Sequence, residues 1–324
     1  MVACRISGDN RNILMVGKAV PEVVLNSGHS MPMLGFGTAG VPLPPLDELV
    51  PVFVVAIEAG YRHFDTATLY GSEEALGLAL AQAQRQGLIK NRGEIFVTTK
   101  LWCSDSHPDL VLLALKKSLQ RLGLDYVDLY LIHYPVRLRQ GIGGSISKGD
   151  VLPFDIKGTW EAMEECSKLG LTKSIGVSNF GAKSFQNFCR MQLLPLLLIR
   201  TCYCLQIEMN VAWQQGNLRK FCQEKGIHVS AWSPLGANGA SWGSLAVIDS
   251  PVLKDIAIAT GKSVAQIALR WIFEQGVTPV VKSFNKADLE KIKQIPQFRA
   301  VLAREFITED GPYKSLEDLW DGEV

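Results

Sequence analysis

The sequence predicts an α/β fold, a single (β/α)8 TIM barrel that begins with a β-hairpin. Short apolar runs typical of buried strands alternate with amphipathic helical patterns along most of the chain. No internal repeat with a period of roughly 20–50 residues is present, which argues against a solenoid. The 324 residues allow one barrel, which takes about 250 residues or more, or two smaller domains. No low-complexity linker divides them.

The composition narrows the functional classes. Hydrophobic residues make up 47% of the chain and charged residues 20%, enough to bury a large core. A net charge of +1 gives no electrostatic footprint for nucleic acid or for an acidic membrane. Seven cysteines without metal-type spacing indicate free thiols in a reducing compartment. Apolar runs such as residues 193–199 are too short to span a bilayer. We therefore expect a cytoplasmic monomer without nucleic-acid or membrane partners.

The N-terminus matches no pattern that we can assign, and we treat residues 1–16 as an extension. Arg5 and Asp9 break up any apolar core of a secretory signal. Met15 is an alternative start, and a transit peptide is an alternative interpretation of this stretch. Residues 17–324 are expected to form one barrel domain.

The first expected elements are a hairpin and a barrel strand. Residues 23–25 and 30–32 flank Asn26-Ser27-Gly28, which is a good turn between two strands. The first barrel strand is expected at residues 33–38, where glycines such as Gly37 permit close backbone approach to a ligand.

Strand–helix units follow to the end of the chain. The first helix is expected at residues 46–59 from the unit pattern, although its valines favour strand locally. That assignment also requires Pro51 to lie in the first turn, because proline is tolerated there and not further in. Later helices are expected at 72–86, with Ser72 as the N-cap, and at 108–122, 155–169 and 212–225. Barrel strands two to eight are expected at 63–67, 94–99, 128–132, 173–177, 204–208, 228–232 and 280–282.

Three successive strands each deliver ionisable groups at or near their carboxyl ends. The strand at 63–67 contains Asp65 and is followed by Tyr70, the next strand runs into Lys100, and the third runs into His133. In a parallel barrel these ends meet at the rim where catalysis takes place.

The four side chains make chemical sense together. A tyrosine titrates near pH 10, so it needs help to act as a proton donor at neutral pH. Lys100 would lower the pKa of Tyr70, and Asp65 would keep the lysine charged and in place. His133 could hydrogen-bond a carbonyl or relay the proton. Each residue alone could be half of an ion pair or part of the core, but the set favours a catalytic site.

Several motifs extend this pattern in order along the chain. They are His63-Phe64-Asp65-Thr66-Ala67, Thr99-Lys100-Leu101-Trp102, Leu129-Tyr130-Leu131-Ile132-His133, Ile175-Gly176-Val177-Ser178-Asn179-Phe180 and Trp232-Ser233-Pro234-Leu235-Gly236. With them the chain resembles the aldo-keto reductases from about Pro21 onward. Details such as Trp102-Cys103-Ser104-Asp105 resemble the plant branch that reduces ketones of specialised metabolism, including polyketides and alkaloids.

The resemblance implies an oxidoreductase that uses NADPH to reduce a ketone or aldehyde to an alcohol. Tyr70 would donate the proton, supported by Lys100 and Asp65, and His133 would orient the carbonyl. Trp102 and Tyr134 would line the substrate pocket, with the long segment 137–151 as one wall or as an ordinary mobile loop.

The resemblance also implies a nicotinamide dinucleotide across the rim, and no Gly-x-Gly-x-x-Gly motif supports a Rossmann site instead. The expected cofactor-binding residues are Gly37, Thr38, Asp65, Ser178, Asn179, Gln206, Trp232, Ser233, Leu235, Lys282 and Ser283. Ser178, Asn179 and Gln206 would hold the carboxamide, and the ring of Trp232 would stack on nicotinamide. Lys282 and Ser283 would grip the 2′-phosphate.

The sequence departs from the family in two places. Residues 191–205 do not match, with Leu205 where the family has asparagine, so the register of strand six and the direction of Gln206 are uncertain. After Lys286 about one helix length is missing, and with it the arginine that clamps the 2′-phosphate. The barrel would then be incomplete at its eighth unit. A non-catalytic nucleotide-binding barrel and a metal-dependent hydrolase remain as alternatives, although the rim shows no set of metal ligands.

Overall fold

The computed structural model describes residues 13–14, 20–142, 146–192, 202–240 and 242–283. Contacts between residues divide the chain into one unit at 1–286 and a second at 287–324. All described residues lie in the first unit. The sequence predicts that a helix is missing after Lys286, and this position lies outside the described residues.

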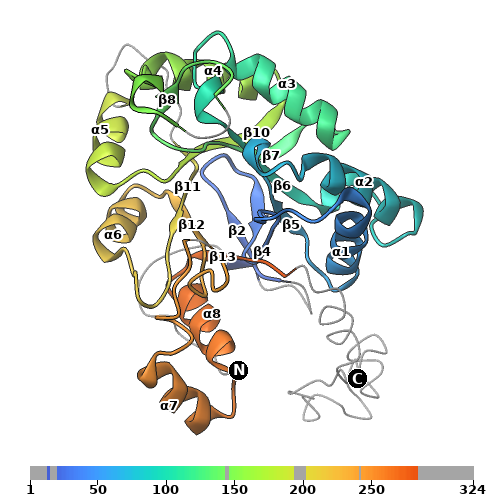
Figure 1. The fold of residues 1–324 in the computed structure, drawn as a ribbon, viewed down its shortest axis with the longest axis vertical. Coiled ribbons are helices and arrows are strands. Elements are labelled where there is room, and N and C mark those ends of the chain that lie inside the picture. The colour runs from blue at the N-terminus through green and yellow to red at the C-terminus, as the bar shows by residue number, and fades with distance from the viewer. Residues whose placement is uncertain (1–12, 15–19, 143–145, 193–201, 241, 284–324) are drawn as a thin grey trace, which may run out of the picture. The chain divides into compact units, whose positions relative to one another are not determined.

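Eight parallel strands close into a barrel, which confirms the predicted fold class (Figure 1). Around the barrel the order is β10-β11-β12-β13-β4-β5-β6-β7. In chain order the strands are β4 (Gly35–Gly37), β5 (His63–Asp65), β6 (Phe96–Leu101), β7 (Val127–Ile132), β10 (Thr172–Ser178), β11 (Cys204–Glu208), β12 (His228–Trp232) and β13 (Thr278–Val281).

Helices surround the strands (Figure 1). They are α1 (Leu46–Glu58), α2 (Glu73–Arg85), α3 (Val111–Leu122), α4 (Ile156–Lys168), α5 (Ala182–Gln192), α6 (Gly216–Glu224), α7 (Pro251–Thr260) and α8 (Val264–Glu274). Two of them begin later than expected, because Pro108 and the residues after it form a turn before α3, and residues 212–215 lead into α6.

The helix α1 forms despite its β-branched residues because it is buried on most sides. Leu49 and every residue from Val52 to Ile57 are buried, so tertiary packing overrides local propensity. The expectation for Pro51 was wrong. Pro51 lies in the second turn, where its missing N–H leaves the carbonyl of Asp47 without the usual helical donor.

The N-terminal hairpin lies at the amino end of the barrel. The strands β2 (Glu22–Val24) and β3 (Ser30–Pro32) pair antiparallel as predicted. A further strand, β1 (Ile13–Leu14), pairs with β2, so part of the N-terminal extension belongs to this sheet. Ser27 bonds Ser174 on β10 at 2.7 Å, and the carbonyl of Pro32 contacts His63 on β5 at 3.2 Å. These bonds attach the hairpin to two separate sides of the barrel.

The long segment after β7 is bounded by a small two-stranded sheet. The strands β8 (Arg137–Leu138) and β9 (Val151–Leu152) pair antiparallel. His107 fixes this sheet to the start of α3, because its Nε2 contacts the Leu138 carbonyl at 2.8 Å and its Nδ1 accepts from Arg137.

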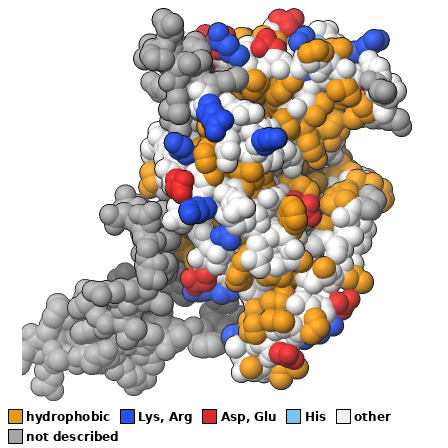
Figure 2. All heavy atoms as spheres, turned by 90° about the vertical axis from the view of Figure 1, so that its left-hand side faces the viewer, with side chains coloured by type: hydrophobic (Ala, Val, Ile, Leu, Met, Phe, Trp, Pro, Cys, Tyr) orange, Lys and Arg blue, Asp and Glu red, His pale blue; other side chains and the backbone are white. Residues whose placement is uncertain are grey.

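Apolar side chains are also found on the surface. Figure 2 shows them gathered at the end of the molecule where α7 lies. There Val252, Ile256 and Ile258 are 66%, 40% and 81% exposed. In the part of the chain that the structure describes, no helix is both long and apolar enough to cross a membrane.

Candidate active site

Three neighbouring strands bring the four predicted catalytic residues to one rim of the barrel. Asp65 ends β5, Lys100 is the fifth residue of β6, and His133 directly follows β7. Tyr70 ends a short 3-10 turn, η1 (Thr68–Tyr70), that continues from β5. Gly71 closes this turn with φ of 70°, a conformation that favours glycine.

Lys100 is the centre of the hydrogen-bond network. Its fully buried ammonium donates to Asp65 Oδ1 at 2.7 Å, to the Thr66 carbonyl at 2.9 Å and to the Tyr70 hydroxyl at 3.2 Å. The other oxygen of Asp65 accepts a bond of 2.7 Å from Gln206 Nε2. A buried charge is thus both paired and hydrogen-bonded, as its desolvation requires.

Burial and neighbouring charges set the protonation states of Lys100 and Tyr70. Burial is the largest single influence and would lower the pKa of Lys100, but Asp65 and Tyr70 together outweigh it through charge and hydrogen bonds, so the lysine pKa is raised. Burial raises the pKa of Tyr70 above its ordinary value, while the Lys100 charge pulls it down. The expected lowering by Lys100 is therefore present but smaller than the effect of burial. At neutral pH the arrangement holds a protonated phenol beside a charged ammonium.

His133 is neutral at any physiological pH. Burial, together with the positive charge of Lys100, lowers its pKa to about 2. Its ring meets the Tyr70 ring edge-on with centroids 5.5 Å apart. Its Nδ1 is buried without a hydrogen-bond partner in the part of the chain that the structure describes. A neutral imidazole beside the phenol can orient a carbonyl, whereas it cannot supply the proton at neutral pH.

Two aromatic rings flank His133. Tyr134 stacks on the imidazole with centroids 5.1 Å apart, and Trp102 meets it edge-on at 5.4 Å. The indole N–H of Trp102 donates to the carbonyl of Ile142 at 3.4 Å, which ties the segment after β7 to this aromatic pair. Tyr134 is 37% exposed, so its ring presents an apolar face to incoming molecules.

A second group of polar side chains lies at the ends of β10, β11 and β12. Asn179 Nδ2 donates to the His133 carbonyl at 2.9 Å, and its Oδ1 accepts from Trp232 Nε1 at 2.9 Å. An asparagine amide has two N–H groups and two lone pairs, so one of each remains. Ser178 Oγ is buried and has no partner among the described residues. These unused groups fit a ligand amide.

The register of β11 was uncertain from the sequence, and the structure fixes it. Ser178 pairs with Gln206 between β10 and β11. In this register Gln206 is buried and reaches Asp65. Gly176 explains why the pairing is tight, because a Cβ there would lie 2.2 Å from the Cys204 carbonyl oxygen.

Comparison with known proteins identifies the family. A model of the aldo/keto reductase family matches residues 33–309. The chain belongs to the aldo/keto reductase family. Rhazimal reductase 2 of Alstonia scholaris is 52% identical, over 94% of this chain and 98% of that protein. NADPH-dependent codeinone reductase 1-4 of Papaver somniferum is 47% identical, over 95% and 99%. A solved Bombyx mori aldo-keto reductase in complex with NADP is 36% identical, with a TM-score of 0.75 over 88% of this chain and 90% of that chain.

The remaining expected cofactor residues of this aldo/keto reductase also lie at or just after strand ends, and two have further contacts that the sequence did not indicate. Gly37 faces Val280, whose Cγ1 would be 3.2 Å from an added Cβ, so the neighbouring strand explains this glycine. Trp232 uses its indole N–H on Asn179, a role that the sequence did not indicate. Ser233 has a positive φ of 49° in the loop after β12, which also contains Leu235. Lys282 and Ser283 follow β13 directly.

Ser72 occupies the predicted N-cap position of α2, but its hydroxyl has other partners. The hydroxyl caps no helix N–H. It bonds Thr38 Oγ1 at 2.6 Å and Thr66 Oγ1 at 3.0 Å instead. The three hydroxyls link the residue after β4 to Thr66 and Ser72, which flank the turn that carries Tyr70 along the chain. This link joins residues up to 34 positions apart, so no local pattern could have indicated it.

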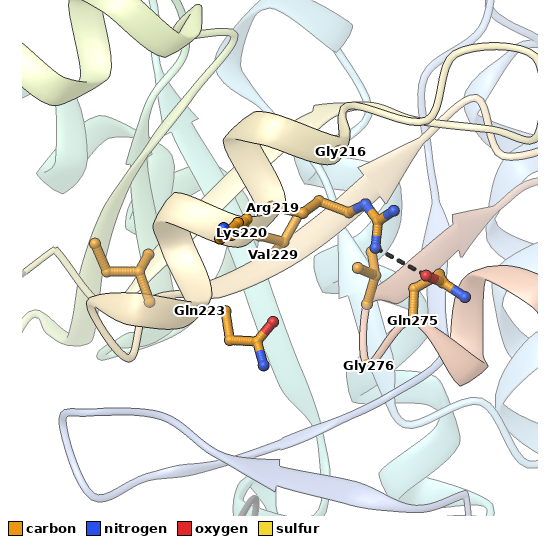
Figure 3. Close-up of a pocket in the computed structure, with 9 residues that line it drawn as sticks. Gly216, Arg219, Lys220, Gln223, Val229, Gln275 and Gly276 are labelled. Carbon is orange, nitrogen blue, oxygen red and sulfur yellow. Dashed lines mark hydrogen bonds between the residues drawn. The ribbon is translucent and has the colours of Figure 1, made fainter. Parts of the chain in front are cut away.

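A groove between α6 and α8 lies apart from these residues (Figure 3). Arg219 spans it and donates to Gln275 Oε1 at 3.0 Å. None of the expected site residues lines it. Among the described residues, no group of three or more His, Cys, Asp or Glu side chains could hold a metal ion.

Proposed function

We propose that this chain is an NADP-dependent oxidoreductase that reduces the carbonyl group of a ketone or aldehyde to an alcohol. NADPH, when bound, supplies the hydride. The observation that carries the proposal is the Tyr70–Lys100–Asp65 chain, with contacts of 3.2 and 2.7 Å beside a neutral His133. The substrate class is supported by plant relatives such as rhazimal reductase 2 and NADPH-dependent codeinone reductase 1-4.

Each residue of the set has a distinct role in this proposal. Tyr70 donates its proton to the carbonyl oxygen as the alcohol forms, since it is the hydroxyl in contact with the ammonium. Lys100 stabilises the resulting phenolate, and Asp65 holds the ammonium in place. His133, being neutral, orients the carbonyl without competing as an acid. Trp102 and Tyr134 form the apolar wall against which the substrate lies.

The cofactor would lie along the ends of β10 to β13. Ser178, Asn179 and Gln206 would hold its carboxamide, because the first two have unused polar groups and Gln206 lies beside Asp65. Trp232 would stack on the nicotinamide while it keeps Asn179 in place. Gly37, Thr38, Ser233 and Leu235 would contact the nucleotide further out. Lys282 and Ser283 would meet the 2′-phosphate.

We further propose a cytoplasmic monomer whose barrel domain extends over residues 17–324. A small-molecule carbonyl compound is its partner in the reaction. The odd number of cysteines supports the reducing compartment, and the six described cysteines are all buried and free.

The deciding variant is Tyr70→Phe, which removes one hydroxyl and leaves the ring and its packing. We expect kcat for carbonyl reduction to fall at least about 10²-fold, as is typical when a general acid is removed. NADPH affinity, followed by fluorescence titration, should stay the same, because the ends of β10 to β13 are unchanged. Normal turnover in this variant would remove Tyr70 from the mechanism.

A non-catalytic nucleotide-binding barrel is the second candidate, and one observation favours it. The alignment with rhazimal reductase 2 extends over 324 positions but takes in only 94% of this chain. Part of that relative therefore has no counterpart here, as expected if a cofactor-binding helix is missing after Lys286. Titration of the protein with NADPH and NADH separates the candidates. Binding without turnover of any carbonyl substrate would favour the second.

A further inference from the structure

A buried carboxylate outside the catalytic set connects the two elements that carry Tyr70 and Lys100. Glu73, in the first turn of α2, is 1% exposed. Its Oε1 accepts a bond of 2.6 Å from Thr99 Oγ1, and its Oε2 accepts one of 2.6 Å from Arg121 Nε on α3. Both oxygens are thus committed to partners, as burial of a carboxylate requires.

The first of these bonds reaches the strand of the catalytic lysine. Thr99 directly precedes Lys100 on β6, and successive side chains of a strand point to opposite faces. Lys100 therefore points into the barrel while Thr99 points outward to α2 and α3. The bond to Glu73 fixes the backbone of β6 at the residue next to the ammonium.

The second bond reaches the turn of the catalytic tyrosine. Arg121 Nη2 donates to Thr68 Oγ1 at 3.3 Å and to Ser118 Oγ at 3.1 Å. The hydroxyls of Thr68 and Ser118 are also 3.1 Å apart. Thr68 opens the 3-10 turn that Tyr70 closes. Two bonds in series therefore connect Glu73 to this turn from the side of α3.

We propose that Glu73 is a positioning residue that sets the distance between the Tyr70 hydroxyl and the Lys100 ammonium. The inference rests on the proposed function only for its effect on turnover. A carbonyl is protonated well only when donor and acceptor are placed to within a fraction of an ångström, and a displacement of about 1 Å can lower the rate about 10²-fold. The contact between Lys100 and Tyr70 is 3.2 Å and joins two separate elements, so it depends on what holds them together.

The test begins with Glu73→Gln, which keeps the shape of the side chain. The amide carries no charge, and its NH2 group can only donate to the Thr99 hydroxyl while its oxygen accepts from Arg121. The variant therefore loses the ion pair with Arg121 and replaces two bonds to a carboxylate by weaker bonds to an amide. We expect kcat to fall roughly tenfold to a hundredfold. KM and the NADPH dissociation constant should stay within about twofold, since the loss concerns the reacting geometry and not binding.

A second readout needs neither turnover nor cofactor. Tyrosinate absorbance is titrated in the free protein, and the Tyr70→Phe difference in each background isolates Tyr70. The Lys100 charge lowers the pKa of Tyr70, so a larger separation in Glu73→Gln should shift this titration to higher pH. This measurement decides on Glu73 even if Tyr70→Phe shows that the proposed reaction is wrong.

Asp128 offers a matched control at the opposite end of the same strands. It too is a buried carboxylate, with a bond of 2.6 Å from Arg92 and one of 2.9 Å from the backbone N–H of Val97 on β6. Asp128→Asn should lower stability and leave kcat of the folded protein and the titration of Tyr70 unchanged. Equal losses of kcat in Glu73→Gln and Asp128→Asn would overturn the proposal. A Glu73→Gln protein with a lower melting temperature but unchanged kcat and unchanged Tyr70 titration would also overturn it.

Thr99 provides a second route if Glu73→Gln does not fold. Thr99→Val removes the hydroxyl and keeps the branched shape, whereas Thr99→Ser restores the hydroxyl. We expect the valine variant to reproduce the loss of kcat and the shift of the Tyr70 titration, and the serine variant to recover both. Identical behaviour of the two variants would show that the bond to Glu73 has no positioning role.

Discussion

At the scale of single residues, Tyr70 and His133 lie side by side and hold opposite states, one with its acidic proton retained and the other without an added proton. Tyr70 keeps its proton because burial raises its pKa, and His133 remains unprotonated because burial lowers its pKa. The same physical cause thus shifts the two pKa values in opposite directions and keeps both the phenol and the imidazole uncharged. Lys100 is the charged member, and Asp65 compensates for its desolvation.

The depressed pKa of His133 makes stability depend on pH. An unfolded histidine titrates near 6.5, whereas folded His133 titrates near 2. Between these values the unfolded chain binds one more proton, so the free energy of unfolding falls as pH falls. The decline is about 1.4 kcal/mol per pH unit well below 6.5. Above about pH 6.5 the histidine is neutral in both states, so the free energy of unfolding no longer depends on its protonation.

We therefore expect His133→Gln to flatten the acid side of the stability curve by that slope, measured by urea unfolding between about pH 4 and 6.5. His63, whose pKa is also lowered by burial, should keep contributing in the variant. His29 is exposed, so His29→Gln serves as the control and should leave the slope as it is. An unchanged slope in His133→Gln would mean that the ring is protonated in the folded state.

At the scale of elements, how well the sequence predicted each one depended on how local its determinants are. The strands that contain Asp65 and Gln206 follow from short apolar runs with flanking polar residues. The structure has the second strand at the expected residues and the first strand two residues shorter at its end. The pairing of Trp232 with Asn179 and of Ser72 with Thr38 depends on partners far along the chain. Such contacts are decided by packing in three dimensions, which propensity and periodicity do not contain.

The helix α1 shows a conflict between a local rule and its packing. Pro51 removes a helical hydrogen bond in the second turn, and no side chain caps the N-terminus at Pro45. We expect Pro51→Ala to restore that bond and stabilise the protein by about 1–2 kcal/mol, less than the full cost of an interior proline because the unfolded chain gains freedom.

The measurement for Pro51→Ala is the midpoint of urea unfolding at an unchanged m-value. Pro45→Ala is the matched control. Pro45 precedes the first helical turn, where no backbone N–H is needed for a helical hydrogen bond, so the substitution restores none. A lower midpoint for Pro51→Ala would show that the ring of the proline packs better than an alanine with its hydrogen bond.

At the scale of the whole molecule, β13 completes the closure of the barrel. This strand has four residues and contains Pro279, which cannot donate to the ladder. Its neighbours are β12 and β4, so it joins the end of the described chain to its beginning. The sequence predicts that the helix following this strand is missing, and that prediction concerns residues outside the described part.

We expect insertion of a family-like helix after Lys286 to raise the melting temperature. Burying roughly 100 Å² of additional apolar surface contributes about 2.5 kcal/mol, a large share of a total stability of about 5–15 kcal/mol. An insertion of equal length made of glycine and serine is the control and should give no gain. If the original chain and the variant with the inserted helix melt at the same temperature, β13 is already covered without the insertion.

The order of the site along the chain has a consequence for how the enzyme can change. Asp65, Tyr70, Lys100 and His133 all come from the first half of the polypeptide, and the residues from Ser178 to Ser283 come from the second. Bonds from Gln206 to Asp65 and from Asn179 to the His133 carbonyl join the two halves. Away from these contacts inheritance can act on the two halves separately, and we expect alterations near Lys282 to change the choice of nucleotide while the set around Tyr70 passes unaltered from one gene copy to the next.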